Sequence, residues 1–133
     1  MTSFVLDASA AVVALVERSG RGRRVRQRLA AATEMAVPAH FLVEAANALR
    51  GLERGGVIGA DELRGALDDL RALPVTEYLV AGLLERAMDL RANATVYDAL
   101  YLVLAEHLDC SVVTADAKLA AVPRTQCSVE VFA

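Results

Sequence analysis

The chain has 133 residues, of which 56% are hydrophobic, and its formal net charge at pH 7 is −3. This length suffices for a sizeable core, and we expect a single domain over residues 1–133. The slightly acidic balance excludes a protein that binds nucleic acid with its whole surface. No uncharged stretch approaches the roughly 20 residues that cross a bilayer, and Asp7 interrupts the apolar region that a signal peptide would need. We therefore expect a cytoplasmic protein without a membrane span.

The first half of the chain alternates short apolar runs with helical patterns. The spacing of Leu42, Ala45 and Leu49 predicts a helix that ends at Gly55. Two Cys residues stand at the edges of apolar runs and are expected to be small core residues, although a bridge between neighbouring strands stays open. The elements expected here are a strand at 4–6, helices at 8–17 and 21–32, a strand at 34–37 closed by Pro38, and a helix at 39–54.

The second half continues the same alternation. Thr95 is a predicted N-cap, and its spacing to Asp98 gives an acidic variant of the capping box. Pro74 stops the helix before it. The elements expected here are a helix at 61–73, a short strand at 75–77, helices at 78–91 and from 96 to about 107, a strand at 111–114, a short helix at 116–120 and a strand at 128–132.

Strands that alternate with helices predict an α/β fold, with an open, mostly parallel sheet covered by helices on both faces. Such three-layer folds bind their ligands just beyond the carboxyl ends of the strands. Asp7 and Asp116 each follow a predicted strand, and the N-terminus of a helix can deliver Asp98 to the same edge. Glu44 can reach that edge from within its own helix.

These four acids lie in strongly apolar stretches of sequence. An ionised carboxylate in such surroundings is costly unless it is paired or bound to a metal. No basic residue stands within any of the four stretches. Taken singly, each acid could be a helix cap or an exposed side chain, but the repetition favours a shared cation. Oxygen ligands alone indicate Mg²⁺ or Mn²⁺ rather than zinc.

Six of the chain's arginines fall between Arg18 and Arg28. Two interpretations are compatible. Val25 and Leu29 could dock one side of a short helix whose other faces carry solvated arginine. An acidic metal site that handles a polyanion also needs positive potential nearby, so part of the segment could contact phosphates. The candidate contacts are Arg21, Arg23, Arg24 and Arg26.

Covalent catalysis is not indicated by the remaining polar residues. Ser9 and Thr114 have no histidine at a recognisable triad spacing, and His40 and His107 are expected to be surface or capping residues. A phosphoacceptor receiver domain would need an acidic pair after the first strand. A haloacid-dehalogenase phosphatase would need Asp-x-Asp, where this chain has Asp7-Ala8-Ser9.

Four blocks of this sequence, in this order, resemble the successive blocks of the PIN-domain family. The similarity is greatest to its VapC-type toxin branch and covers essentially the whole chain. The blocks are Val5-Leu6-Asp7-Ala8-Ser9; Pro38-Ala39-His40-Phe41-Leu42-Val43-Glu44-Ala45-Ala46-Asn47-Ala48-Leu49; Thr95-Val96-Tyr97-Asp98-Ala99-Leu100-Tyr101; and Val113-Thr114-Ala115-Asp116-Ala117-Lys118-Leu119.

The resemblance implies a PIN-like α/β/α domain with metal-dependent endoribonuclease activity. In that family the matching acids Asp7, Glu44, Asp98 and Asp116 would hold Mg²⁺ or Mn²⁺. Asn47 and Thr114 match polar positions beside the site, and Ser9 matches the hydroxyl that follows the first acid. The stretch from Arg18 to Thr33 varies within such families, and no roles are transferred to it.

The resemblance also implies partners, namely an RNA substrate, a small VapB-like antitoxin that covers the acidic cleft, and a second copy in a homodimer. The helices at 41–54 and 61–73 carry more leucines than one buried face requires, which fits a covered surface, although the surplus could equally be core. Two alternatives stay open. One is a housekeeping PIN nuclease without antitoxin, and the other is an interaction module whose acids no longer bind metal.

Overall fold

The computed structural model describes residues 3–133 and is built around a five-stranded sheet. The strand order is β3-β2-β1-β4-β5, and every neighbouring pair is parallel, which confirms the expected α/β class. The strands are β1 (Phe4–Leu6), β2 (Met35–Pro38), β3 (Val75–Tyr78), β4 (Ser111–Thr114) and β5 (Val129–Val131).

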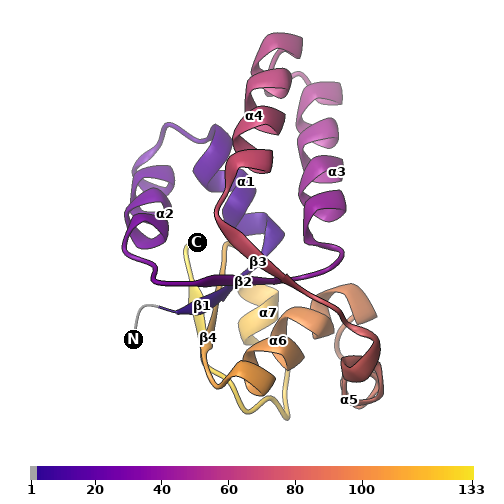
Figure 1. Cartoon of the computed structure of the whole chain (residues 1–133). Helices are drawn as coiled ribbons and strands as arrows, with labels where there is room; N and C mark the ends of the chain where they lie inside the picture. The colour runs from indigo at the N-terminus through magenta and orange to yellow at the C-terminus, as the bar shows by residue number, and fades with distance from the viewer. Residues whose placement is uncertain (1–2) are drawn as a thin grey trace.

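Helices cover both faces of this sheet (Figure 1). On one side α1 packs against α2, α3 and α4, and the pair α3–α4 extends away from the sheet; on the other side α6 packs against β1, β2 and β4. None of the helices within residues 3–133 combines the length and the apolar character that a membrane span requires. The helices are α1 (Ala8–Val16), α2 (Gly20–Ala30), α3 (Phe41–Arg54), α4 (Ala60–Ala72), η1 (Ala81–Leu83), α5 (Leu84–Met88), α6 (Val96–Leu108) and α7 (Ala117–Ala120).

The core is centred on β1 and α6. All three residues of β1 are fully buried, because the strand lies in the middle of the sheet with helices above and below it. In α6 every residue from 99 to 105 is buried, since this helix lies between the sheet and α5. Such all-round apolar character is typical of a helix enclosed in the core. The strand and the helix thereby provide a rigid base for the side chains at their ends.

The register between β1 and β4 places two polar residues side by side. Leu6 pairs with Val113, and the N–H of Asp7 donates to the carbonyl of Val113 over 2.9 Å. Thr114, the residue after Val113, is therefore level with Asp7 where the two central strands end. This edge of the sheet is where a parallel α/β fold is expected to hold its ligand.

The prediction of one helix over residues 78–91 is wrong. Tyr78 is the last residue of β3, pairs with Pro38, and donates a hydrogen bond from its hydroxyl to Glu34 over 3.3 Å. The chain therefore stays extended through Tyr78, and Gly82, a poor helix former, lies in the following 3-10 turn. Only the five residues of α5 form a regular helix in this segment.

The predicted N-cap at Thr95 is confirmed, because the N–H of Asp98 donates to the Thr95 hydroxyl oxygen over 3.2 Å.

Candidate active site

Four acids from four elements lie around the carboxyl edge of the sheet. Asp7 follows β1 and is the N-cap residue of α1, whereas Asp116 follows β4 and caps α7. Glu44 lies in the first turn of α3, and Asp98 lies in the first turn of α6. These positions follow from the fold, since parallel strands deliver their carboxyl ends, and the helices that follow them, to one edge of the sheet.

Asp7 is the most deeply buried of the four acids, with 6% of its surface exposed. Its Oδ2 accepts hydrogen bonds from the hydroxyls of Ser9, over 2.5 Å, and Thr114, over 2.6 Å. The two hydroxyl oxygens are themselves held, because Ser9 Oγ accepts from the N–H of Ala115 and Thr114 Oγ1 accepts from the N–H of Asp116, each over 3.0 Å. Asp7 is thus fixed in orientation by hydroxyls from two elements.

Glu44 is held by a buried tyrosine from the facing helix. The hydroxyl of Tyr101 donates to Glu44 Oε1 over 2.8 Å, and the Tyr101 side chain is fully buried. Burial and the neighbouring Glu44 raise the pKa of Tyr101, so its hydroxyl stays protonated and acts as a donor. The His40 ring meets Tyr101 edge to face at 5.1 Å between centroids. Glu44 therefore has one fixed oxygen.

Burial is the largest cause that raises the pKa of Asp7, Glu44 and Asp98 above their ordinary values. Repulsion adds to it, since Asp98 acts on Asp7, both of these act on Glu44, and Asp116 acts on Asp98. None of the ion pairs formed within residues 3–133 includes any of these acids. The four carboxyls therefore lie within reach of one another's charge without a basic ion-pair partner, and a cation would relieve both the burial cost and the repulsion.

The chemistry of these donors fits a hard divalent cation. All the groups are oxygen atoms, as Mg²⁺ and Mn²⁺ prefer, and the adjoining hydroxyls orient the carboxylates. The carboxyls are not drawn together as tightly as in a closed site: across the described part of the chain, no three Asp, Glu, His or Cys side chains are grouped closely enough to hold one ion. Mutual repulsion between carboxylates favours this spread arrangement.

Most of the other predicted site residues lie near these acids. Ser9 and Thr114 bind Asp7, and Asn47 is exposed one turn along α3 from Glu44. Tyr101 and His40 are contacts that sequence reasoning missed. One signal was present for Tyr101, which lies three residues after Asp98 and therefore on the same face of α6.

The predicted arginine contacts divide into two pairs. Arg21 donates to the Glu17 carboxylate, and Arg26 donates to the backbone carbonyls of Ala14 and Glu17, over 3.1 and 2.6 Å. Arg23 and Arg24 are exposed, and neither forms an ion pair or a side-chain hydrogen bond with another described residue. The helix expected here is present as α2, and Val25 docks it in the core as predicted.

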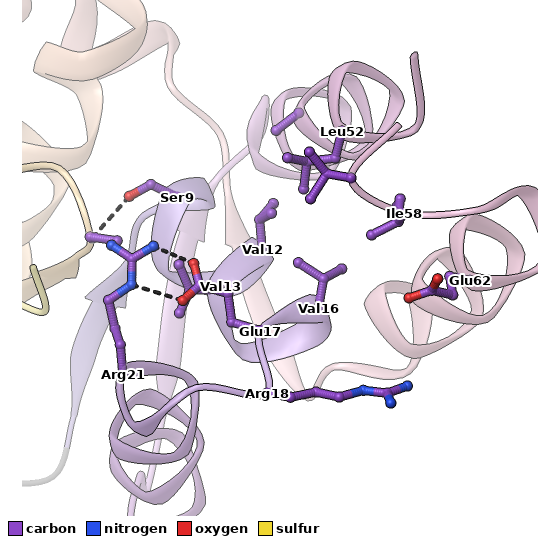
Figure 2. Close-up of a pocket in the computed structure, with 13 residues that line it drawn as sticks. Ser9, Val12, Val13, Val16, Glu17, Arg18, Arg21, Leu52, Ile58 and Glu62 are labelled. Atoms are coloured by element: carbon purple, nitrogen blue, oxygen red, sulfur yellow. Dashed lines mark hydrogen bonds and ion pairs between the residues drawn. The ribbon is translucent and has the colours of Figure 1, made fainter. Parts of the chain in front are cut away.

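A cavity of about 650 Å³ lies between α1, α3 and α4, and its lining includes Ser9, which binds Asp7. Figure 2 shows Ser9 at one end, Arg18 and Glu62 at the other, and apolar side chains of α1 and α3 between them. The Arg21–Glu17 ion pair lies along its side. The apolar lining comprises Val12, Val13, Val16, Ala48, Leu52, Val57, Ile58 and Ala115.

Comparisons with known proteins agree with this fold and show the family. Residues 4–125 match the family model of the PIN domain. Ribonuclease VapC9 of Mycobacterium tuberculosis is 43% identical over 128 residues, which cover 96% of this chain and 97% of that protein. The chain therefore belongs to the PIN-domain family, in the branch of the VapC ribonucleases.

Two solved structures share the fold at low sequence identity. PAE2754 from Pyrobaculum aerophilum superposes with a TM-score of 0.73 at 21% identity, covering 97% of this chain and 83% of that one. VapBC2 from Rickettsia felis, bound to a DNA fragment from its promoter, gives a TM-score of 0.68 at 14% identity, covering 97% and 98%. At such identities these likenesses bear on the fold alone.

Proposed function

We propose that this chain is a metal-dependent endoribonuclease and the toxin of a VapBC-type toxin–antitoxin pair, active as one domain in the cytoplasm. The observation that carries the proposal is the set of acids Asp7, Glu44, Asp98 and Asp116, which repel one another and have no basic ion-pair partner among residues 3–133. Membership of the VapC ribonuclease branch supports RNA as the substrate.

In this proposal the four carboxylates hold Mg²⁺ or Mn²⁺, which supplies an activated water and offsets charge on the scissile phosphate. Ser9 and Thr114 keep Asp7 in one orientation through their hydrogen bonds to its Oδ2. Because both hydroxyls donate to this carboxylate, neither is arranged as a nucleophile, and no covalent intermediate with the protein is needed. In the same way, the hydrogen bond from Tyr101 holds Glu44 in one orientation.

The proposed antitoxin would occupy the cavity between α1, α3 and α4. The cavity has an apolar lining and reaches Ser9, so one bound segment of the antitoxin would bury apolar surface and cover the acids. The leucines predicted to be surplus are mostly core, since Leu49 and Leu70 are buried and Leu52, Leu63 and Leu67 pack against the core. Membership of the VapC branch supports the pairing, because the resemblance to VapC-type toxins implies a VapB-like antitoxin.

The proposed homodimer would use a different surface, at the end of β3 and along α5. Leu79, Leu84 and Met88 are exposed there, within ten residues of one another. Exposed apolar side chains grouped in this way are typical of a contact surface. Sedimentation of wild type and of a Leu84→Glu, Met88→Glu variant tests this surface, and we expect only the wild type to dimerise.

Cleavage of RNA by the purified chain in Mg²⁺ or Mn²⁺ tests the activity. Asp7→Asn and Asp98→Asn should each lower the rate by at least about a hundredfold while the protein stays folded, because both carboxylates act through the cation. Glu130→Gln is a matched control, since this acid is tied to Arg28 instead. Unchanged cleavage in both site variants would refute the metal-nuclease proposal. If the wild type is inactive and a titration shows that it binds no metal, the chain is an interaction module whose acids no longer bind metal.

Growth distinguishes the toxin from a housekeeping nuclease. Expression of the wild type alone should arrest growth, Asp98→Asn should not, and co-expression of a short neighbouring gene for a DNA-binding antitoxin should restore growth. Harmless expression of a chain that cleaves RNA in vitro would favour the housekeeping alternative.

A further inference from the structure

A second cavity has Glu44 in its wall. It has a volume of about 300 Å³ and is formed where the first turns of α3 and α6 meet. Its lining residues are His40, Val43, Glu44, Asn47 and Tyr97. Because Glu44 belongs both to this wall and to the acid set, a group bound in the cavity lies directly beside the candidate active site.

Two side chains of this wall are unusually exposed for apolar groups. Tyr97 has 64% and Val43 has 73% of its surface accessible to solvent. The neighbouring His40 is fixed, because its Nε2 is 3.0 Å from the Tyr97 carbonyl oxygen and its ring contacts both Tyr97 and Tyr101. The cavity therefore presents a supported aromatic and imidazole surface to solvent.

The charges in the wall indicate which part of an RNA would fit. No Lys or Arg is among the described residues that line it, and Glu44 adds negative charge, so a phosphate would be repelled. An aromatic face suits a nucleobase, which can stack on Tyr or His side chains. The Asn47 amide carries both donors and an acceptor, as the edge of a base requires.

We propose that His40, Val43, Asn47 and Tyr97 form a base pocket that binds one unstacked nucleobase of single-stranded RNA, from the nucleotide next to the scissile phosphate. This inference rests on the proposed ribonuclease function and adds where the substrate is recognised. Since an RNA base is accessible for stacking only outside a duplex, the base pocket also selects loops and single strands. The acids then act on the phosphate, and the base pocket sets which bond reaches them.

A double-mutant cycle between protein and RNA tests the base pocket. The cleaved bond is first located in a pool of single-stranded oligonucleotides, and one cleaved oligonucleotide is then made with an abasic site at each nucleotide flanking that bond. Cleavage kcat/KM is measured for wild type, Tyr97→Ala and Tyr97→Phe. Tyr97 is exposed in the first turn of α6, so neither change removes a core contact, and thermal melts verify folding.

In the wild type, one flanking abasic site should lower kcat/KM by about 5- to 150-fold, the range for loss of one base–aromatic stack. Tyr97→Ala should cost a similar factor on the intact RNA, mostly in KM, and the abasic site should then cost nothing further. Tyr97→Phe, which keeps the ring, should behave as wild type. Gln126→Ala is the control and should cleave as the wild type does, because this exposed side chain lines neither this cavity nor the larger one.

Three results would overturn the base pocket. Tyr97→Ala could cleave as well as wild type, the two losses could simply multiply, or Tyr97→Ala could dissociate a dimer and slow intact and abasic RNA equally. The last result would make this surface a contact between two copies. Failure of the wild type to cleave any RNA in Mg²⁺ or Mn²⁺ would instead refute the proposed function, and the base pocket with it.

Discussion

Two groups of partly buried carboxylates in this molecule are stabilised in opposite ways. Glu106 has 11% of its side chain exposed and receives two hydrogen bonds from Arg86, over 3.1 and 3.0 Å. Asp7 is buried to a similar degree, but the side chains that donate hydrogen bonds to it are hydroxyls, and the charged group that shifts its pKa is another acid, Asp98. At similar burial, Glu106 is therefore paired with the cationic side chain of Arg86, whereas Asp7 has no such partner among residues 3–133.

The pKa shifts record the same difference. Hydrogen bonds from arginine lower the pKa of Glu17 and Glu130, whereas burial raises the pKa of Asp7 and Asp98. Arginines remain that pair with no acid, since Arg23 and Arg24 form no ion pair with any residue from 3 to 133. The four acids at the carboxyl edge of the sheet nonetheless have no ion-pair partner among these residues, which is the pattern expected where an external cation binds.

The largest expected effect is stabilisation by metal. Saturating Mn²⁺ should add about 2.7 kcal/mol to the free energy of unfolding at a hundredfold excess over its dissociation constant. Asp116→Asn should be more stable than wild type in EDTA, because it relieves repulsion with Asp98, and should lose most of the Mn²⁺ effect. Thermal melts near pH 7 measure both. Glu130→Gln should keep the full Mn²⁺ shift, and identical wild-type melts in EDTA and Mn²⁺ would contradict a shared site.

Tyr101→Phe should lower Mn²⁺ affinity about 10- to 100-fold, the usual cost of removing a group that orients a metal ligand. The change deletes only the hydroxyl that donates to Glu44, and the ring still fills the core. Calorimetric titration with Mn²⁺ measures the affinity without relying on cleavage. Tyr78→Phe, which removes the hydroxyl bound to Glu34 far from the acids, is the control. Equal affinities in the two variants would show that Glu44 needs no such support.

Replacing Arg23 and Arg24 with Gln should weaken RNA binding severalfold and flatten its dependence on salt. If both arginines contact phosphates of single-stranded RNA, the slope of log affinity against log salt should fall by about 1.4. Arg28→Gln should leave that slope unchanged, because Arg28 is bound to Glu130 and lies 4.4 Å from the centre of the Phe4 ring. An unchanged slope in the double variant would support a merely solvated helix.

The smallest expected effects are opposite pH dependences of stability. The raised pKa of Asp98 gives a contribution that is complete below about pH 4 and is lost as pH rises through the folded-state pKa. In EDTA, Asp98→Asn should therefore gain stability over wild type at pH 7 but not below pH 4. Glu130, with a lowered pKa, stabilises above its unfolded pKa and loses this contribution as pH falls. Glu130→Gln should cost about 0.5 kcal/mol at pH 7, typical of a partly exposed pair.

Denaturant unfolding across this pH range measures both differences. If the two variants change stability in the same direction at pH 7, the distinction between paired and unpaired acids fails.

Sequence patterns predicted the fold and the neighbourhood of the acids because both depend on local signals. A strand that ends at an acid, as Asp7 and Asp116 show, specifies the edge of the sheet once the strands are parallel. The Thr95 cap was also predictable from the sequence, because the Thr95 hydroxyl accepts from the N–H of Asp98, only three residues away. The pairing of Arg21 with Glu17 at i,i+4 could have been anticipated for the same reason.

Contacts between elements far apart in sequence were not predictable in this way. Tyr101 meets Glu44 across 57 residues, and only the tertiary fold brings these two side chains together. The error at residues 78–91 has a similar origin. A helical pattern was present there, but pairing of Tyr78 with β2 held the chain extended, and tertiary structure overrode the local preference.

The hydrogen bond between Asp7 and Thr114 joins residues 107 positions apart. During synthesis, β1 leaves the ribosome among the first segments, but one of its two neighbours in the sheet is β4, among the last. A nascent chain that stops before residue 111 lacks β4, Thr114 and Asp116, so Asp7 lacks one of its two supporting hydroxyls and one of its three acidic companions. Synthesis thus delivers Asp7 and Glu44 early, and β4 and Asp116, which complete the site, late. A prematurely released chain carries no assembled site into a cell whose RNA the finished enzyme would cut.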